Sequence, residues 1–97
     1  MKLSEKLRAL REAEELSQAK FCDITGLSLN TLKKYERGNF EPSGNALLKI
    51  TTHPQFQKYT LWLMTDKTAP QAGQIAPALA HIGPDSTTSD QSVKQIG

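Results

Sequence analysis

Residues 17–38 read SQAKFCDITGLSLNTLKKYERG, and this stretch decides the predicted fold. Ser17 can cap one helix, and Ser28 can cap a second helix that ends at Gly38. Gly26 lies between the two as the natural left-handed residue that closes the first helix. Two short helices joined by such a tight turn are typical of a helix-turn-helix.

The spacing inside this stretch agrees with that motif. Counted from Gln18, a small residue is needed fifth, where the two helices cross closely, and Cys22 is small enough. Glycine is needed ninth, and Gly26 lies there. Apolar residues are needed fifteenth and eighteenth to anchor the second helix, and these are Leu32 and Tyr35. Because four separate positions agree, the pattern is more specific than a single glycine between two helices.

Three further helices are predicted around this unit, which gives five short helices in residues 1–66. Residues 3–14 form the first, because their leucines repeat on one face with the 3.6-residue period. Ser43 can cap the fourth, and Pro54 suits the start of a fifth that ends near Asp66. The apolar residues that we place in these three helices are Leu3, Leu7, Leu10, Leu47, Leu48, Ile50, Phe56, Tyr59, Trp62 and Leu63.

The composition divides the chain at residue 67 and limits its class. Residues 1–66 hold nearly all the leucine and every aromatic side chain, whereas residues 67–97 are rich in Ala, Gly, Pro, Gln, Ser and Thr. We therefore expect a domain followed by a short apolar segment and a disordered end. No apolar run is long enough to span a bilayer, and a single cysteine excludes an internal disulfide. The sequence indicates a small cytoplasmic domain.

The residues with catalytic potential are not arranged as a site. His53 and His81 lie on opposite sides of the predicted domain boundary, and neither has an acid close in sequence. No metal-ligand spacing, glycine-rich phosphate loop or nucleophile elbow is present. We therefore expect no enzyme activity, no metal and no cofactor.

Several of these segments together resemble the Cro/CI (XRE) family of phage repressors. The matching segments are LSQ at 16–18, GLS at 26–28, YERG at 35–38 and PS at 42–43. Residues 54–62 and 69–81, which include PQF, KYTLW and GQIAPALAH, are similar to the C immunity repressors of peduovirus-type temperate phages. The resemblance implies an all-α, λ-repressor-like five-helix domain. It also implies a repressor that silences an early lytic promoter and maintains lysogeny.

In this family the helix after the turn lies in the major groove of double-stranded operator DNA. The positions that read bases match Ser28, Leu29, Asn30, Lys33 and Lys34. An asparagine can pair with adenine, a lysine can reach guanine acceptors, and a leucine can lie on a thymine methyl group. The positions expected to contact phosphates are Ser17, Gln18, Thr31, Arg37 and Asn39, with Lys33 as a further candidate. Arg11 and Glu36 match positions that pair in related repressors.

The charge of the motif and the apolar tail both favour a homodimer. Residues 17–38 hold four cations against two carboxylates, a surplus of +2 that equals the net charge of the whole chain. One copy would bind DNA weakly, so two copies are expected. The predicted dimer interface is Leu61, Trp62, Ile75, Leu79 and Ile82, with Pro77 at an edge if the segment is a strand. The alternative is that this segment folds back on its own subunit.

Two other functions stay open on sequence grounds. An antitoxin that represses its own operon would use a similar domain and cover a toxin with the apolar tail. A protein-interaction module that no longer binds DNA is the other alternative. Acidic or bulky residues at positions 30, 33 or 34 would favour it, but this chain has Asn30, Lys33 and Lys34 there. A repressor of this length has no room for a self-cleaving domain, so induction would require an outside agent such as an antirepressor.

Overall fold

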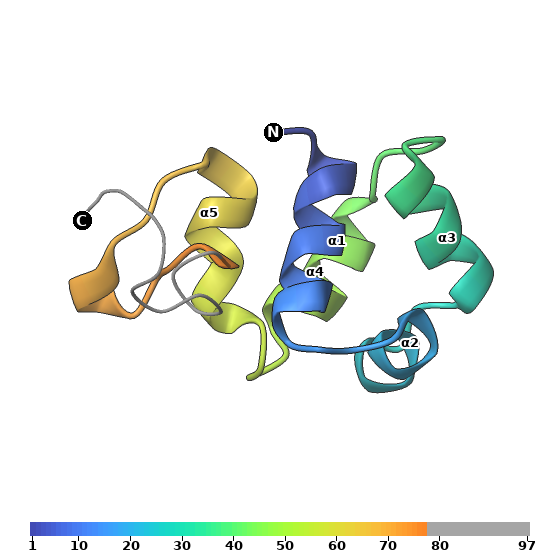
Figure 1. Cartoon of the computed structure of the whole chain (residues 1–97), viewed down its shortest axis with the longest axis horizontal. Coiled ribbons are helices and arrows are strands. Elements are labelled where there is room, and N and C mark those ends of the chain that lie inside the picture. The colour runs from blue at the N-terminus through green and yellow to red at the C-terminus, as the bar shows by residue number, and fades with distance from the viewer. Residues whose placement is uncertain (78–97) are drawn as a thin grey trace.

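The computed structural model describes residues 1–77, and within them the chain is all-α, as the sequence predicts (Figure 1). Five α-helices are joined by short connections, and a short 3₁₀ turn precedes and another follows the last helix. The elements are α1 (Leu3–Ala13), α2 (Gln18–Thr25), α3 (Leu29–Arg37), α4 (Gly44–Thr51), η1 (Gln57–Tyr59), α5 (Thr60–Thr65) and η2 (Pro70–Ala72). No helix in this part of the chain is long and apolar enough to cross a membrane.

The serine caps and the glycine turn are confirmed. The hydroxyl groups of Ser17, Ser28 and Ser43 each accept a backbone N–H three residues further on, at 3.0 Å for the first and 3.1 Å for the other two. Gly26 closes α2 with φ of 86°, in the left-handed region that favours glycine. Each cap satisfies a backbone donor that the helix itself cannot pair.

The core lies where the helices meet, with α1 packed against both α3 and α5 and α2 packed against α3. Cys22 and Leu32 are both buried in it, as the helix-turn-helix spacing requires. The buried apolar residues are Leu7, Leu10, Phe21, Cys22, Leu27, Leu32, Ala46, Ile50, Phe56, Tyr59, Trp62 and Leu63. In Figure 1, α3 lies at one end of the molecule and α5 lies on the other side of α1.

The prediction that the fifth helix starts at Pro54 is wrong. Phe56 lies in a turn and Tyr59 in η1, and α5 begins only at Thr60. Both aromatic rings are fully buried. Side chains three residues apart are eclipsed in a 3₁₀ turn, whereas in an α-helix they are offset around the axis. The tighter turn therefore directs both rings into the core.

Residues 69–76 pack on the domain. Ala69 and Gln74 form an antiparallel bridge, and the N–H of Ile75 donates to the carbonyl of Lys58 at 2.8 Å. The Gln74 side chain accepts from the N–H of Leu61 at 2.9 Å and donates to the carbonyl of Gln57 at 3.0 Å. The disordered end predicted from the composition lies outside the described residues.

Candidate nucleic-acid interface

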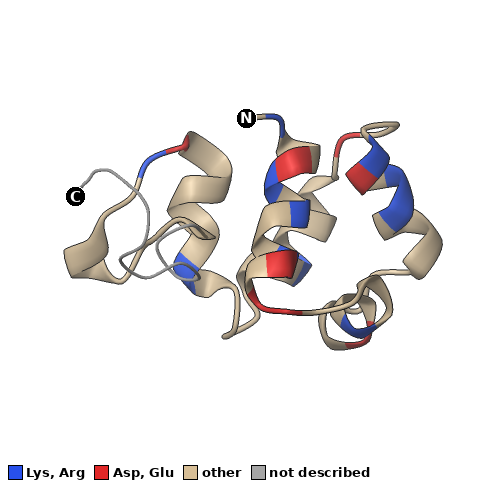
Figure 2. Cartoon of the chain, viewed as in Figure 1, with Lys and Arg blue, Asp and Glu red and all other residues tan. Residues whose placement is uncertain are grey.

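One side of α3 is anchored in the core and the opposite side is exposed. Leu32 is fully buried, and Tyr35 is half-buried against the core. Leu29 is 40% exposed, and Asn30 is also exposed. Figure 2 shows basic residues along the same helix, which lies at the outer edge of the molecule. This side of α3 therefore presents an apolar group, an amide and several cations to the surroundings.

The predicted base-reading residues at the start of α3 differ in whether their side chains are already hydrogen-bonded within the protein. The hydroxyl of Ser28 accepts the N–H of Thr31 at 3.1 Å and donates to the Thr31 hydroxyl at 2.7 Å. Its hydrogen-bonding capacity is thus largely used within the helix cap. Within residues 1–77 no hydrogen bond engages the Asn30 side chain, so the amide keeps both its donor and its acceptor for a partner.

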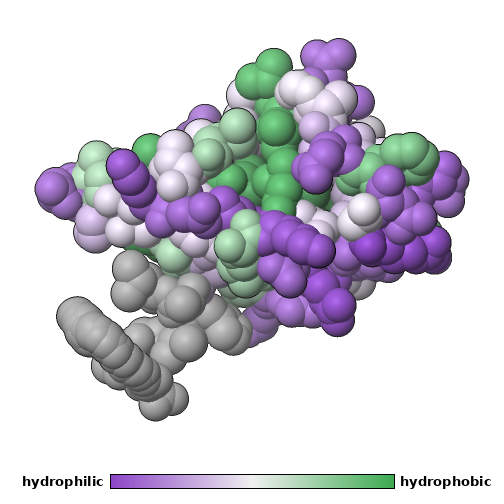
Figure 3. All heavy atoms as spheres, turned by 90° about the horizontal axis from the view of Figure 1, so that it is seen from above, coloured by the Kyte–Doolittle hydropathy of each residue, from purple (hydrophilic) through white to green (hydrophobic). Residues whose placement is uncertain are grey.

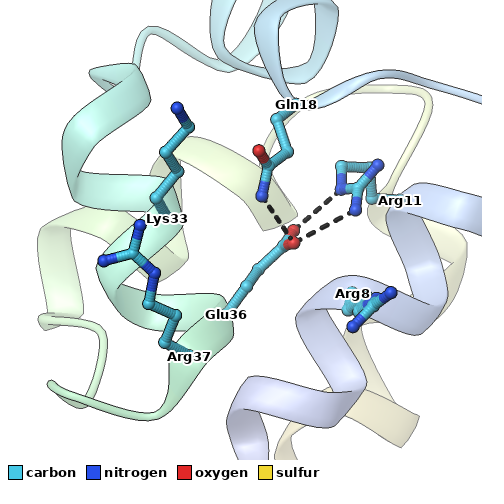
Figure 4. A pocket seen from close by; sticks show the side chains of 6 residues that line it. All are labelled: Arg8, Arg11, Gln18, Lys33, Glu36 and Arg37. Atoms are coloured by element: carbon cyan, nitrogen blue, oxygen red, sulfur yellow. Dashed lines mark hydrogen bonds and ion pairs between the residues drawn. The ribbon is translucent and has the colours of Figure 1, made fainter.

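The two lysines of α3 point in different directions. Lys33 lines a shallow hollow between α3 and α1, together with Arg37 (Figure 4). Lys34 instead lies beside the loop after α3, with its Nζ atom 5.4 Å from the centre of the Phe40 ring. Lys33 is therefore placed with the groups expected to meet phosphates, and Lys34 lies near the end of the helix.

The predicted pair of Arg11 and Glu36 is confirmed and includes a third residue. Arg11 donates to Glu36 from Nε at 2.8 Å and from Nη2 at 3.1 Å, and it also donates to the carbonyl of Leu16 at 2.7 Å. The Gln18 side chain donates to the same carboxylate at 3.0 Å. Figure 4 shows both side chains directed at Glu36. The hydrogen bond from Arg11 to Glu36 raises the pKa of Arg11, so the guanidinium group keeps its charge.

This network forms the floor of a hollow with a basic rim. The hollow has a volume of about 530 Å³ and opens between α1, α2 and α3. Its lining residues are Arg8, Arg11, Gln18, Lys33, Glu36 and Arg37. Four of these six carry positive charge, but Arg11 is paired with Glu36 and Arg8 with Glu12, so Lys33 and Arg37 are the two that have no ion pair within residues 1–77. A hollow of this charge is suited to a phosphate group.

The other predicted phosphate contacts lie at the two ends of the helix-turn-helix. Ser17 is exposed at the start of α2, where its hydroxyl is used as the cap. Arg37 and Asn39 are exposed around the end of α3, and the N–H of Asn39 donates to the carbonyl of Lys34 at 3.0 Å. Thr31 is half-buried with its hydroxyl bonded to Ser28. Arg37 is the member of this group with an exposed positive charge.

The predicted dimer residues are divided between the core and the undescribed end. Trp62 is 9% exposed and Ile75 packs against the core, so both contact their own subunit. Leu61 is half-buried on α5. Leu79 and Ile82 lie outside the described residues. Figure 3 shows hydrophobic residues gathered across one face of the molecule.

Three residues that the sequence did not single out contribute to this region or support it. Arg8 lines the hollow from α1, Phe40 contacts Lys34, and Lys6 is buried under α5. Lys6 lies on the same face of α1 as Leu3 and Leu10, but a lysine is ordinarily solvated, so the periodicity did not predict its burial. Phe40 lies in a loop without periodicity, so no local pattern could have placed it.

Comparison with known proteins gives the family. Residues 7–54 match the protein family described as Helix-turn-helix. The chain is 46% identical over 95 residues to Repressor protein C of Escherichia phage P2, covering 98% of this chain and 96% of that protein. It is 42% identical over 50 residues to the cryptic phage CTXphi transcriptional repressor RstR of Vibrio cholerae, covering 52% of this chain and 45% of that protein. The chain belongs to the helix-turn-helix family of phage C repressors.

Proposed function

We propose that the chain is a sequence-specific transcriptional repressor of a phage early lytic promoter, which it silences to maintain lysogeny. The observation that carries this proposal is the free outer side of α3, with Leu29 and Asn30 exposed on a helix-turn-helix. Similarity to a repressor over nearly the whole of both chains supports it. The site of action is the bacterial cytoplasm, on DNA.

The outer side of α3 enters the major groove, and each of its residues contacts a different group on the bases. Asn30 pairs with an adenine edge, Leu29 contacts a thymine methyl group, and Lys34 reaches guanine acceptors. Ser28 contributes less, because its hydroxyl is engaged in the cap with Thr31. Once the helix is docked, the bound protein occupies the DNA that RNA polymerase needs.

The hollow between α1 and α3 receives the DNA backbone. Lys33 and Arg37 direct their charges to its rim, and the start of α2 at Ser17 and Gln18 supplies backbone N–H groups at a positive helix end. These contacts do not depend on sequence, so they fix the position of α3 in the groove. Arg11 is a supporting residue here, since its charge is used on Glu36.

The active form in this proposal is a homodimer. A single domain with a surplus of +2 releases few counterions, and a second copy doubles the phosphate contacts. Leu61, Leu79 and Ile82 are the interface residues we propose. Trp62 and Ile75 contribute indirectly, because they pack within their own subunit. Sedimentation of the purified chain alone tests this point: a stable homodimer is expected, and a monomer at micromolar concentration would contradict it.

The repressor function is tested by selection from a random duplex library. The wild-type chain is expected to enrich one sequence, and protection mapping on its own regulatory region should locate that sequence over a promoter. Transcription from that promoter by purified bacterial RNA polymerase should then fall when the chain is added. Failure to enrich any duplex, or an enriched site with undiminished transcription, would contradict the proposal.

A further inference from the structure

Phe40 is a large apolar residue exposed next to the recognition helix. It lies in the loop between α3 and α4 and is 58% exposed. Its ring centre lies 5.4 Å from Nζ of Lys34, within the range of an attractive contact between an ammonium group and an aromatic ring. The ring is therefore in a position to restrain the end of a long and otherwise mobile side chain.

Lys34 differs from the two other lysines that contact aromatic rings in residues 1–77. Lys6 lies over Trp62 but also forms an ion pair with Asp66 at 2.7 Å. Lys58 lies over Tyr59 but also forms an ion pair with Glu14 at 2.9 Å. In the described part of the chain Lys34 has the ring contact without an ion pair.

Among the described residues, Lys34 has no ion pair although a carboxylate lies close to it. A hollow of about 310 Å³ lies beside it, lined by Thr31, Lys34, Tyr35, Phe40, Glu41 and Ser43. Although Glu41 lines the same hollow, its carboxylate makes no ion pair with Lys34 in residues 1–77. A carboxylate would use the charge and the N–H donors of the ammonium group. A ring face restrains the group without neutralising its charge, and N–H donors that point away from the ring stay available for an acceptor.

We propose that Phe40 is a positioning residue for Lys34: it holds the ammonium group ready for a base or phosphate acceptor on DNA. This inference rests on the proposed function, since it concerns the same interface. A lysine side chain carries considerable rotational freedom, and restraining it before binding reduces the cost of ordering it in the complex. Phe40 thus contributes to operator affinity through Lys34.

A double-mutant cycle on the full chain tests this inference. The variants are Phe40→Leu, Lys34→Ala and the two combined, with Phe40→Trp as the conservative replacement that keeps an aromatic face. The probe is the duplex that the wild-type chain enriches from a random library, titrated by fluorescence anisotropy. Phe40→Leu should weaken binding about two- to fivefold when Lys34 is present and have no effect when residue 34 is alanine. Phe40→Trp should bind as the wild type does.

Two further measurements separate positioning from a structural role. Thermal unfolding without DNA should give the same midpoint for Phe40→Leu and Phe40→Trp. In proton NMR of the free chain, the side-chain methylene next to the Lys34 ammonium should be shifted upfield by the ring, and the shift should disappear in Phe40→Leu. Both results would support restraint of Lys34 in the free protein.

The outcomes distinguish this inference from the proposed function. If the wild type enriches a duplex but the effects of Phe40→Leu and Lys34→Ala simply add, or Phe40→Leu binds as the wild type does, the inference is overturned and the repressor function stands. If no duplex is enriched, the proposed function fails, and the inference fails with it.

Discussion

Arg11 and Glu36 meet in a two-point contact between α1 and the last turn of α3, with N–O distances of 2.8 and 3.1 Å. Their side chains are 11% and 5% exposed, so both charges are largely removed from water. The Gln18 amide also donates to this carboxylate, which brings the start of α2 into the same contact. The orientation of the recognition helix relative to the two preceding helices therefore depends on this pair.

Removing one partner of this pair should be costly, and removing both less so. Glu36→Leu leaves the largely buried Arg11 guanidinium without its partner and should lower the free energy of unfolding by about 3 kcal/mol. Arg11→Met with Glu36→Leu removes both charges and should lose clearly less than the two single changes together. Urea unfolding of the four proteins measures the coupling. Losses that simply add would show that the pair is not a structural unit.

A buried lysine should hold the end of α5 to α1. Lys6 Nζ donates to the carbonyls of Trp62 at 3.3 Å and Leu63 at 3.2 Å, and it lies 2.7 Å from the exposed carboxylate of Asp66. Lys6→Met keeps the length of the side chain but leaves the Leu63 carbonyl without a donor, whereas the Trp62 carbonyl keeps the N–H of Asp66 at 2.9 Å, so it should cost about 1–3 kcal/mol.

Asp66→Asn is the matched comparison for Lys6→Met, because it removes only the exposed part of the contact. It should cost clearly less than Lys6→Met, because solvent screens an exposed ion pair. Asparagine also tolerates the left-handed backbone at this position, where φ is 66°. Chemical unfolding of both variants decides between the two contributions. If Asp66→Asn were the more damaging change, the carbonyl contacts would not be what Lys6 provides.

Glu14 should make stability depend on pH in the acid range. Burial alone would raise the pKa of Glu14, but hydrogen bonds from Tyr59, Lys58 and Gln55 outweigh it and lower the pKa below its ordinary value of 4.5. A carboxyl group whose pKa is lowered in the folded state gives its full stabilisation at pH values above its pKa in the unfolded chain. That contribution is lost as the pH falls through the folded-state pKa.

The expected result is a smaller acid sensitivity in Glu14→Gln. At pH 7 this variant should be less stable than the wild type by about 1 kcal/mol, and the difference should shrink as the pH falls below about 4.5. The exposed neighbour Glu15 provides the control, since Glu15→Gln leaves the Tyr59 contact in place. Thermal unfolding from pH 3 to pH 7 makes the comparison. A constant difference across this range would contradict the assignment.

Alanine at two glycines should have opposite effects. Gly26 has a φ of 86° and nothing within 4 Å of the added carbon atom, so Gly26→Ala should cost about 1–2 kcal/mol through backbone strain alone. Gly44 begins α4, has ordinary backbone geometry and also has open space, so Gly44→Ala should be neutral or stabilise by up to about 1 kcal/mol. Equal effects of the two substitutions in thermal unfolding would mean that the left-handed backbone at position 26 does not require glycine.

The sequence predicted those elements whose signals are local. The caps at Ser17, Ser28 and Ser43 and the turn at Gly26 follow from single residue types next to a periodic segment, and all four are confirmed. The pairing of Arg11 with Glu36 came from family resemblance, and the structure confirms it. Local rules were sufficient for the caps and the turn because each of these is formed within one helix end.

The features that the sequence did not predict depend on contacts distant in sequence. The start of α5 at Thr60 depends on burying Phe56 and Tyr59 together. The Tyr59 hydroxyl donates to Glu14, which lies 45 residues earlier in the sequence. The burial of Lys6 depends on carbonyls at the end of α5. No window of neighbouring residues contains these partners, so their positions could not be read from a local pattern.

The most direct test of DNA reading by α3 compares Asn30→Ala and Arg37→Ala on the enriched duplex and on a random duplex at several salt concentrations. Gln71→Ala and Lys67→Ala are the matched controls and should bind as the wild type does. Both residues are exposed in the segment that follows α5, and this segment lies at the end of the molecule opposite α3 (Figure 1). Asn30→Ala should lose about 1–3 kcal/mol on the enriched duplex and little on the random one. Arg37→Ala should weaken both alike and reduce the salt slope by about one. Equal losses for both variants on both duplexes, or no loss for either, would contradict base reading by this helix.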